Sequence, residues 1–385
     1  METNIKYTTE NILRIAKRFQ NKKRSYLLVN ALQAKHMPCS PSASLDMMRT
    51  FGEMLAKTYP NTKLIISFAE TATAIGAVVA SCFAPDCMYV HTTREQVDAV
   101  SAWIDFLEEH SHATEQKLCA DNLQFWLENT ETVIFVEDEI STGKTLVNMM
   151  TQFITQYPIL KEKKCIAASI FNRVSAENQK CMEKVGLDCA YLLKLPEIDY
   201  TKAVNEIQVT EAKRVIDKNA DFHNQMLDCQ ALYNPRKGVM IQHYIENCRQ
   251  MADTVISAFM HNIKPNSSIL VLGTEECMFP ALFLGAMLER QNCGFIVKCH
   301  ATTRSPIGIC TNQDYPIVSG CKLKSFYAEN RDTYIYNVAE YDVVIVVSDT
   351  ELQDLAALKN IMGAFTKNGY QQFYYVKGGK NVWYI

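Results

Sequence analysis

The stretch VIFVEDEISTGKT, residues 133–145, constrains this chain more than any other part of its sequence. Four apolar residues lead directly into three carboxylates, Glu137, Asp138 and Glu139, and a turn rich in hydroxyl groups follows after Ile140. An uninterrupted apolar run is typical of a strand buried on both faces of a parallel sheet. The stretch therefore predicts an α/β fold, with its carboxylates at the carboxyl edge of the sheet, where such folds bind ligands.

The chemistry of this stretch fits a phosphorylated sugar. Adjacent carboxylates at a sheet edge cost free energy unless hydrogen-bond donors pair with them. The vicinal hydroxyls of a ribose supply two such donors. The turn after them opens a helix, so its backbone N–H groups and hydroxyls converge on an anion site that suits a phosphate. Gly143 permits the tight turn. The residues expected at this phosphate site are Ser141, Thr142, Gly143, Lys144 and Thr145.

Other interpretations of the stretch explain less of it. A nucleotide-binding P-loop requires a glycine five positions before Gly143, where Asp138 stands instead. A magnesium or calcium site, as in response-regulator-like folds, explains the carboxylates but not the hydroxyl-rich turn. A capped helix after a strand explains Ser141 but not three carboxylates.

The remaining sequence repeats the alternation of strands and helices that a doubly wound parallel sheet predicts. The 385 residues suggest two domains, which we place at 1–220 and 221–385. Three landmarks recur in the second half: 44 positions separate Arg94 from Asp138, and 45 separate Arg304 from Asp349. The second α/β domain is therefore a candidate degenerate repeat of the first, although any two α/β domains share such a rhythm.

The composition indicates an ordinary globular protein with no general affinity for nucleic acid or membranes. The formal net charge is −3, and no apolar run is long enough to span a bilayer. The first residues lack a signal sequence, so we expect a cytoplasmic protein. Its 14 cysteines form no C-x-x-C pair, so we expect neither disulfides nor a structural metal. The basic residues Lys22, Lys23, Arg24, Lys35 and His36 are interpreted as a solvated patch.

The central stretch resembles the signature of type I phosphoribosyltransferases, in which two carboxylates hold the ribose of phosphoribosyl pyrophosphate (PRPP) and a Thr-Gly-x-Thr turn holds its 5'-phosphate. Glu137 and Asp138 match the carboxylate pair, whereas Glu139 departs from the usual aliphatic residue. The segments SFAETATAIG, YVHTTRE, EEHSHAT and ATTRSP resemble an orotate-transferase-like bacterial subgroup with a C-terminal Thr-Arg-Ser-Pro domain. That subgroup is associated with tellurite resistance and stress.

The resemblance implies further site residues in the first half. The loop Ala69, Glu70, Thr71, Ala72 and Thr73 would bind pyrophosphate through backbone amides; otherwise Thr71 or Thr73 simply caps a helix. Glu70 is unfavourable beside pyrophosphate unless Mg²⁺ bridges the two. Gly76 then allows close packing of the helix.

Basic residues of the first half are candidates for the chemical step. Arg94 would bind pyrophosphate and stabilise it as the leaving group, or else form a surface ion pair. His110 and His112 lie in a segment that in this fold closes over the substrate, and they would act on the acceptor or the pyrophosphate unless they are solvated loop residues. Lys117 is a weaker candidate of the same kind.

In the second half the same landmarks carry different residues. The expected site consists of Glu275, Thr303, Arg304, Ser305 and Asp349. The residues after Asp349 form no Thr-Gly-x-Thr turn, so a PRPP 5'-phosphate has no place there. This domain is expected to bind something else or to complete the first site, and Arg236 is a further candidate for it.

The reaction implied is transfer of phosphoribosyl from PRPP to a nitrogenous, base-like acceptor with release of pyrophosphate, or the reverse, with Mg²⁺ as cofactor. The acceptor is undetermined, since residues 1–50 and 171–173 are the candidates for the variable hood. A homodimer is expected. The alternative is a non-catalytic PRPP or nucleotide sensor, although no helix-turn-helix candidate supports a DNA-binding regulator.

Overall fold

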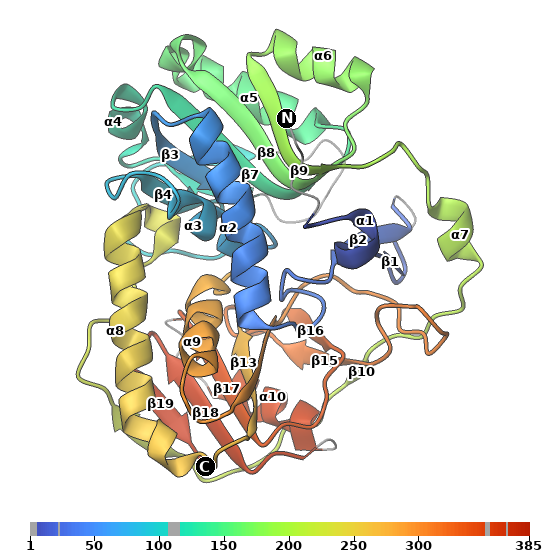
Figure 1. The fold of residues 1–385 in the computed structure, drawn as a ribbon, viewed down its shortest axis with the longest axis vertical. Helices are drawn as coiled ribbons and strands as arrows, with labels where there is room; N and C mark the ends of the chain where they lie inside the picture. Colours follow the sequence, from blue (N-terminus) through green and yellow to red (C-terminus); the bar gives the residue numbers. More distant parts are fainter. Residues whose placement is uncertain (1–5, 22–23, 107–115, 351–354, 367–368) are drawn as a thin grey trace. The chain divides into compact units, whose positions relative to one another are not determined.

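The computed structural model describes residues 6–21, 24–106, 116–350, 355–366 and 369–385, which divide into two units (Figure 1). The first unit consists of residues 46–198 and 233–245, and the second of residues 1–45, 199–232 and 246–385. The units therefore differ from the contiguous ranges 1–220 and 221–385. The first 45 residues, expected as a hood of the first domain, group with the C-terminal half, because an N-terminal hairpin and the following loop pair with residues of that half.

The first unit is built on a mainly parallel sheet with the strand order β12-β4-β3-β7-β8-β9 in the described residues. Among the described strands of this sheet, only β12 runs antiparallel to its neighbour. In β7, Val133 to Val136 are fully buried, as the apolar run predicts. The strands are β3 (Thr62–Ser67), β4 (Met88–His91), β7 (Thr132–Ile140), β8 (Lys164–Asn172), β9 (Leu187–Lys194) and β12 (Val239–Met240).

Helices cover both faces of this sheet, as a doubly wound fold requires (Figure 1). On one face, a core of buried residues joins alternate positions of β3, β7 and β8 to α4 (Leu123–Glu128), α5 (Lys144–Gln156) and Met182 of α6 (Ala176–Lys184). The hairpin β5 (Trp103–Phe106) and β6 (Gln116–Cys119) belongs to the same core. On the other face α3 (Thr73–Ala80) packs on β3 and β4, with α2 (Pro41–Thr58) against it. The short helices are η1 (Pro158–Glu162) and η2 (Pro235–Lys237).

The second unit contains another mainly parallel sheet, with the order β11-β19-β18-β17-β13-β14 in the described residues. Its strands are β11 (His223–Met226), β13 (Ser268–Gly273), β14 (Ile296–Ala301), β17 (Val343–Ser348), β18 (Gln372–Lys377) and β19 (Asn381–Tyr384). Its helices are α1 (Thr9–Ile12), α7 (Thr201–Asn205), α8 (Ile241–Phe259), η3 (Met260–Asn262), α9 (Phe279–Glu289) and α10 (Ala356–Thr366). The core lies between the sheet, α10 and a smaller sheet formed by β10 (Lys213–Arg214), β15 (Gly320–Lys324) and β16 (Asp332–Tyr336).

The N-terminal residues of the second unit are bound to it through backbone pairing. The hairpin β1 (Leu13–Lys17) and β2 (Tyr26–Asn30) ends beside a bridge from Arg18 to Ile307, and Cys39 bridges to Cys299. All 14 cysteines carry free thiols.

The two sheets share one topology, as the recurring landmarks in the sequence suggested. The parallel order β4-β3-β7-β8 in the first unit corresponds to β14-β13-β17-β18 in the second. Each unit inserts an antiparallel hairpin at the same point of the chain, β5–β6 after β4 and β15–β16 after β14. Thr93 lies two positions after the end of β4, and Thr303 lies two positions after the end of β14. Each pairs with the hairpin inserted after its strand, Thr93 with Lys117 and Thr303 with Tyr334.

The backbone hydrogen bonds at the strand ends match residue by residue. Phe68 N donates to Val136 O at 3.0 Å, and Thr274 N donates to Val347 O at 3.2 Å. Thr92 N donates to Ser67 O at 2.9 Å, and Thr302 N donates to Gly273 O at 3.0 Å. Shared topology together with these bonds supports the internal repeat and fixes its register. In that register the second-unit counterparts of Glu70, Arg94 and Asp138 are Glu276, Arg304 and Asp349.

Gly76 is required by close packing of α3 on the sheet. A Cβ atom there would lie 2.4 Å from Ser67 Cβ and 2.9 Å from Tyr89 Cε2. We expect Gly76→Ala to lower the free energy of unfolding by about 1–3 kcal/mol, because overpacking outweighs the gain in helix propensity. Urea unfolding measures this. The control is Gly186→Asn, at a positive φ that asparagine tolerates and with no atom within 4 Å of the added Cβ. Equal stability of the two variants would contradict the packing role.

Candidate active site

The end of β7 presents its carboxylates on different sides of the strand. Glu137 and Glu139 line a pocket, together with Phe68, Phe106 and residues of the 141–145 turn. Asp138, the position between them, accepts a hydrogen bond from Thr71 Oγ1 at 2.8 Å. Successive side chains of a strand alternate, so the expected carboxylate pair reaches both the pocket and the loop at 69–73.

The expected phosphate loop forms the helix start that the sequence predicted. Gly143 precedes α5 with a φ of 72°, in the left-handed region, and a Cβ there would lie 2.5 Å from Met182 Sδ. Ser141, Thr142, Gly143 and Thr145 line the pocket, whereas Lys144 is exposed and does not line it. The N–H groups of the first turn of α5 add positive potential at this point.

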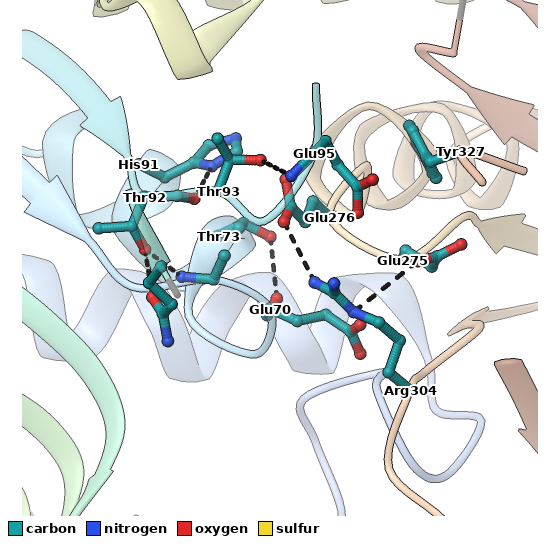
Figure 2. A network of polar contacts seen from close by, with 12 residues as sticks. Glu70, Thr73, His91, Thr92, Thr93, Glu95, Glu275, Glu276, Arg304 and Tyr327 are labelled. Atoms are coloured by element: carbon teal, nitrogen blue, oxygen red, sulfur yellow. Dashed lines mark hydrogen bonds and ion pairs between the residues drawn. The ribbon is translucent and has the colours of Figure 1, made fainter. Parts of the chain in front are cut away.

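The loop at 69–73 is held from the neighbouring strand. Ala69 N donates to Thr92 Oγ1 at 2.9 Å, and Thr73 Oγ1 donates to Glu70 O at 3.4 Å (Figure 2). The peptide bond between Ala69 and Glu70 is cis. Ala72 and Thr73 are buried, and α3 starts at Thr73, as the interpretation as a helix start required.

Asp138 carries a perturbed carboxyl group. Burial raises its pKa, the hydrogen bond from Thr71 lowers it, and the nearby charge of Glu139 raises it, so that the net pKa lies above its ordinary value. Glu139 itself lies 3.6 Å from the guanidinium of Arg173, with both side chains largely buried. The departure of Glu139 from the usual pattern thus has a local explanation, because Arg173 neutralises it.

The end of β4 carries His91, Thr92, Thr93 and Arg94, of which the first three are fully buried. Thr93 Oγ1 accepts hydrogen bonds from Glu95 N at 2.9 Å and from Arg236 Nε at 3.3 Å. Arg236, expected as a candidate for a second-domain site, is buried in the first unit. The sequence could not indicate this position, because Arg236 lies 143 positions from Thr93 along the chain.

His110 and His112 fall outside the described residues. Lys117 of β6 stacks its ammonium 4.3 Å from the centre of the Trp103 ring, and its backbone pairs with Thr93. Lys117 therefore anchors the base of the hairpin to the strand end that bears Arg94.

The second unit brings its expected residues to the corresponding sheet edge, where they bind one another. Glu275 is fully buried, with Arg331 Nη2 at 2.9 Å, Arg304 Nε at 3.8 Å and a hydrogen bond from Ser325 Oγ at 2.6 Å. Arg304 Nη2 also lies 3.3 Å from Glu276 Oε1 (Figure 2).

The other expected residues of the second unit are bound internally as well. Asp349 accepts a hydrogen bond from the Tyr327 hydroxyl at 2.5 Å. Thr303 pairs with Tyr334, and Ser305 N donates to Thr303 Oγ1 at 3.2 Å. Arg304, Arg331 and Tyr327 therefore place cationic and hydroxyl partners beside the carboxylates of this cluster.

Lys35 is a buried part of this cluster, which corrects its interpretation as a solvated residue. Its side chain is 0% exposed, and Nζ donates to the carbonyl oxygens of Glu275 at 2.7 Å and Thr302 at 2.9 Å. A run of basic residues predicts solvent-exposed side chains only where the chain lies at the surface. Here the segment that contains Lys35 lies against β14, where Cys39 pairs with Cys299.

Within the part of the chain that the structure describes, no group of three or more His, Cys, Asp or Glu side chains is arranged to hold a metal ion. No helix in that part is both long and apolar enough to cross a membrane.

The raised pKa of Asp138 predicts a pH-dependent stability difference. Because the pKa is higher in the folded than in the unfolded chain, stability from this group is present below the unfolded value of about 3.9 and is lost as the pH rises through the folded value. Asp138→Asn should therefore be more stable than the wild type at neutral pH, with the difference shrinking towards about pH 4. Urea unfolding across this range tests it; a difference independent of pH would contradict it.

The Arg331–Glu275 pair should contribute far more than an exposed ion pair in the same unit. Arg331→Gln should lower the free energy of unfolding by up to about 3–5 kcal/mol, because it weakens the compensation of a buried carboxylate. The control is Arg214→Gln, which removes an exposed pair with Asp332 at 2.7 Å and should cost about 1 kcal/mol or less. Denaturant unfolding measures the loss in free energy of unfolding for both variants. Equal losses would show that Glu275 is not charged in the folded unit.

Comparison with known proteins relates each half to a described family. Residues 12–195 match a family described as phosphoribosyl transferase, and residues 234–365 match the TRSP domain, described as C-terminal to that transferase domain. No curated protein matches the chain.

Similar solved structures include APRTase from Giardia lamblia complexed with 9-deazaadenine, which is 16% identical with a TM-score of 0.30 and matches 49% of this chain and 96% of that one. Adenine phosphoribosyl transferase from Trypanosoma brucei in complex with AMP, pyrophosphate and ribose-5-phosphate is 11% identical with a TM-score of 0.34, over 48% of this chain and 77% of that one. Residues 12–195 of this chain are thus similar to a phosphoribosyl transferase domain, and residues 234–365 are similar to the TRSP domain that follows it.

Proposed function

We propose that the first unit transfers the 5-phosphoribosyl group of PRPP to a nitrogenous, base-like acceptor and releases pyrophosphate, or catalyses the reverse reaction. The observation that carries this proposal is the pocket at the end of β7, which Glu137 lines together with Ser141, Thr142 and Thr145. A carboxylate and a hydroxyl-bearing helix start on one pocket wall suit a sugar and its phosphate.

In this proposal the two carboxylates hold the ribose while positive charge develops at C1 in the transition state. Glu137 and Asp138 accept hydrogen bonds from the ribose hydroxyls, and their negative charge favours the oxocarbenium character of the ring. The 141–145 loop anchors the 5'-phosphate, so binding energy remote from C1 positions the reacting centre. The high pKa of Asp138 is lowered again once ligand hydroxyls donate to it.

The leaving pyrophosphate would be bound at the adjacent strand ends. The amides of Ala69 and Ala72 already donate to Thr92 Oγ1 and Phe68 O, so the other backbone amides of the 69–73 loop and Arg94 would supply donors and charge for it. The buried Arg236 adds positive potential behind Thr93. Mg²⁺ would be held by PRPP itself, with the Glu70 carboxylate as the ligand from the chain, because Mg²⁺ prefers oxygen donors. When bound it would neutralise the pyrophosphate charge.

The second unit would not bind PRPP. Arg304, the counterpart of Arg94, is already neutralised by Glu275 and Glu276, and a second anion would have to displace both carboxylates. We propose that Thr303, Arg304, Ser305, Glu275 and Asp349 form an ion-paired relic of the repeated site, so the chain binds one PRPP.

The resemblance to the orotate-transferase-like subgroup supports proposals about the localisation, the oligomeric state and the cellular role of the protein. We propose a cytoplasmic homodimer that acts in stress-associated synthesis or salvage of a nucleotide-like metabolite. Gel filtration of the full chain tests the dimer.

Calorimetric titration of PRPP into the full chain with Mg²⁺ tests the transferase proposal. We expect one PRPP per chain, and a loss of affinity of about 10–100-fold in Asp138→Asn, because one charge-assisted hydrogen bond becomes neutral. Asp188→Asn, on an exposed position of β9, should bind like the wild type. A screen of acceptors for pyrophosphate release then identifies the second substrate.

Two outcomes would overturn the proposal. Folded wild-type protein that does not bind PRPP excludes the transferase function. Binding of two PRPP molecules per chain would show that the second unit retains a site despite its internal ion pairs.

A further inference from the structure

Gln116 lines the pocket in which we propose that the sugar and its 5'-phosphate bind, although it belongs to none of the sequence motifs described above. It is the first residue of β6, and it lines the pocket together with Glu137, Ser141 and Thr142. Its side chain is partly exposed there. No sequence pattern marks a lone glutamine, so only the fold places it at this site.

The orientation of the Gln116 amide is determined by Thr92. Thr92 Oγ1 accepts the N–H of Ala69 at 2.9 Å and donates to Gln116 Oε1 at 2.5 Å; Figure 2 shows both bonds of Thr92. A hydroxyl has a single proton to donate. With Oε1 held by that proton, the Nε2 group of Gln116 is on the other side of the amide, and it has no hydrogen-bond partner among the described residues.

The chemistry of Nε2 restricts what it can bind. An amide NH₂ group donates hydrogen bonds and accepts none. The partner must therefore present an oxygen or nitrogen acceptor, and the pocket already offers hydroxyl donors at Ser141, Thr142 and Thr145. Several donors beside the carboxylates of Glu137 and Glu139 suit a phosphorylated sugar, whose hydroxyls bind Glu137 and whose other oxygens accept.

We propose that Gln116 is a substrate-binding residue whose Nε2 group donates to an oxygen of the phosphoribosyl group. This inference rests on the proposed function. It also assigns a role to Thr92, whose hydroxyl couples the pyrophosphate loop at Ala69 to the orientation of Gln116. The counterpart of Gln116 in the second unit is Thr333, which has no amide to donate.

Two substitutions of Gln116 distinguish the effect of the lost hydrogen-bond donor on binding from the effects of charge and of side-chain shape. Gln116→Glu keeps an acceptor oxygen for Thr92 and the same shape, but replaces the donor by a negatively charged acceptor. Gln116→Met removes the donor without adding charge. Calorimetric titration of PRPP with Mg²⁺ should show about 10-fold weaker binding for Gln116→Met, and a larger loss for Gln116→Glu because carboxylate and phosphate repel.

The matched control is Gln156→Glu, the same chemical change at an exposed position at the far end of α5, which should bind like the wild type. Thermal unfolding confirms that each variant is folded. If the wild type and both Gln116 variants bind PRPP equally well, or if only Gln116→Glu is weakened, the donor role is wrong while the transferase proposal stands. If the wild type does not bind PRPP, both fail.

Discussion

A threonine hydroxyl at the end of one strand holds the loop after the neighbouring strand, and it does so in both units. Thr92 accepts the N–H of Ala69, and Thr302 accepts the N–H of Glu275, each at 2.9 Å. Both threonines are fully buried. A buried amide left without an acceptor is costly, so this bond fixes the loop conformation, and with it the positions of the residues that face a ligand.

The same framework has opposite electrostatic consequences in the two units. In the first unit the residue whose amide the threonine binds is Ala69, which carries no charge. In the second it is Glu275, a buried carboxylate that needs Arg304 and Arg331 for compensation. Because desolvated charges must be paired, one substitution at this position commits the neighbouring arginines to internal ion pairs. A repeat of the backbone therefore need not repeat the function.

The family boundaries and the structural units overlap only in part. Residues 234–365 match the TRSP domain, yet residues 233–245 belong to the first unit, where β12 extends the sheet beside β4 and Arg236 binds Thr93. Residues 12–45 match the transferase family, yet they belong to the second unit. Each family match therefore includes a segment that belongs to the other structural unit.

The sequence alone determined the local features of this protein. The apolar run before Glu137 predicted a buried parallel strand, the turn with Gly143 predicted a helix start, and matched spacings predicted the repeat, because each depends on neighbours along the chain. Tertiary structure alone decided which distant residues meet: Gln116 at Thr92, Arg236 at Thr93, and Lys35 in the second unit. Such contacts follow from packing between segments far apart in the chain, and no local pattern of residue types encodes them.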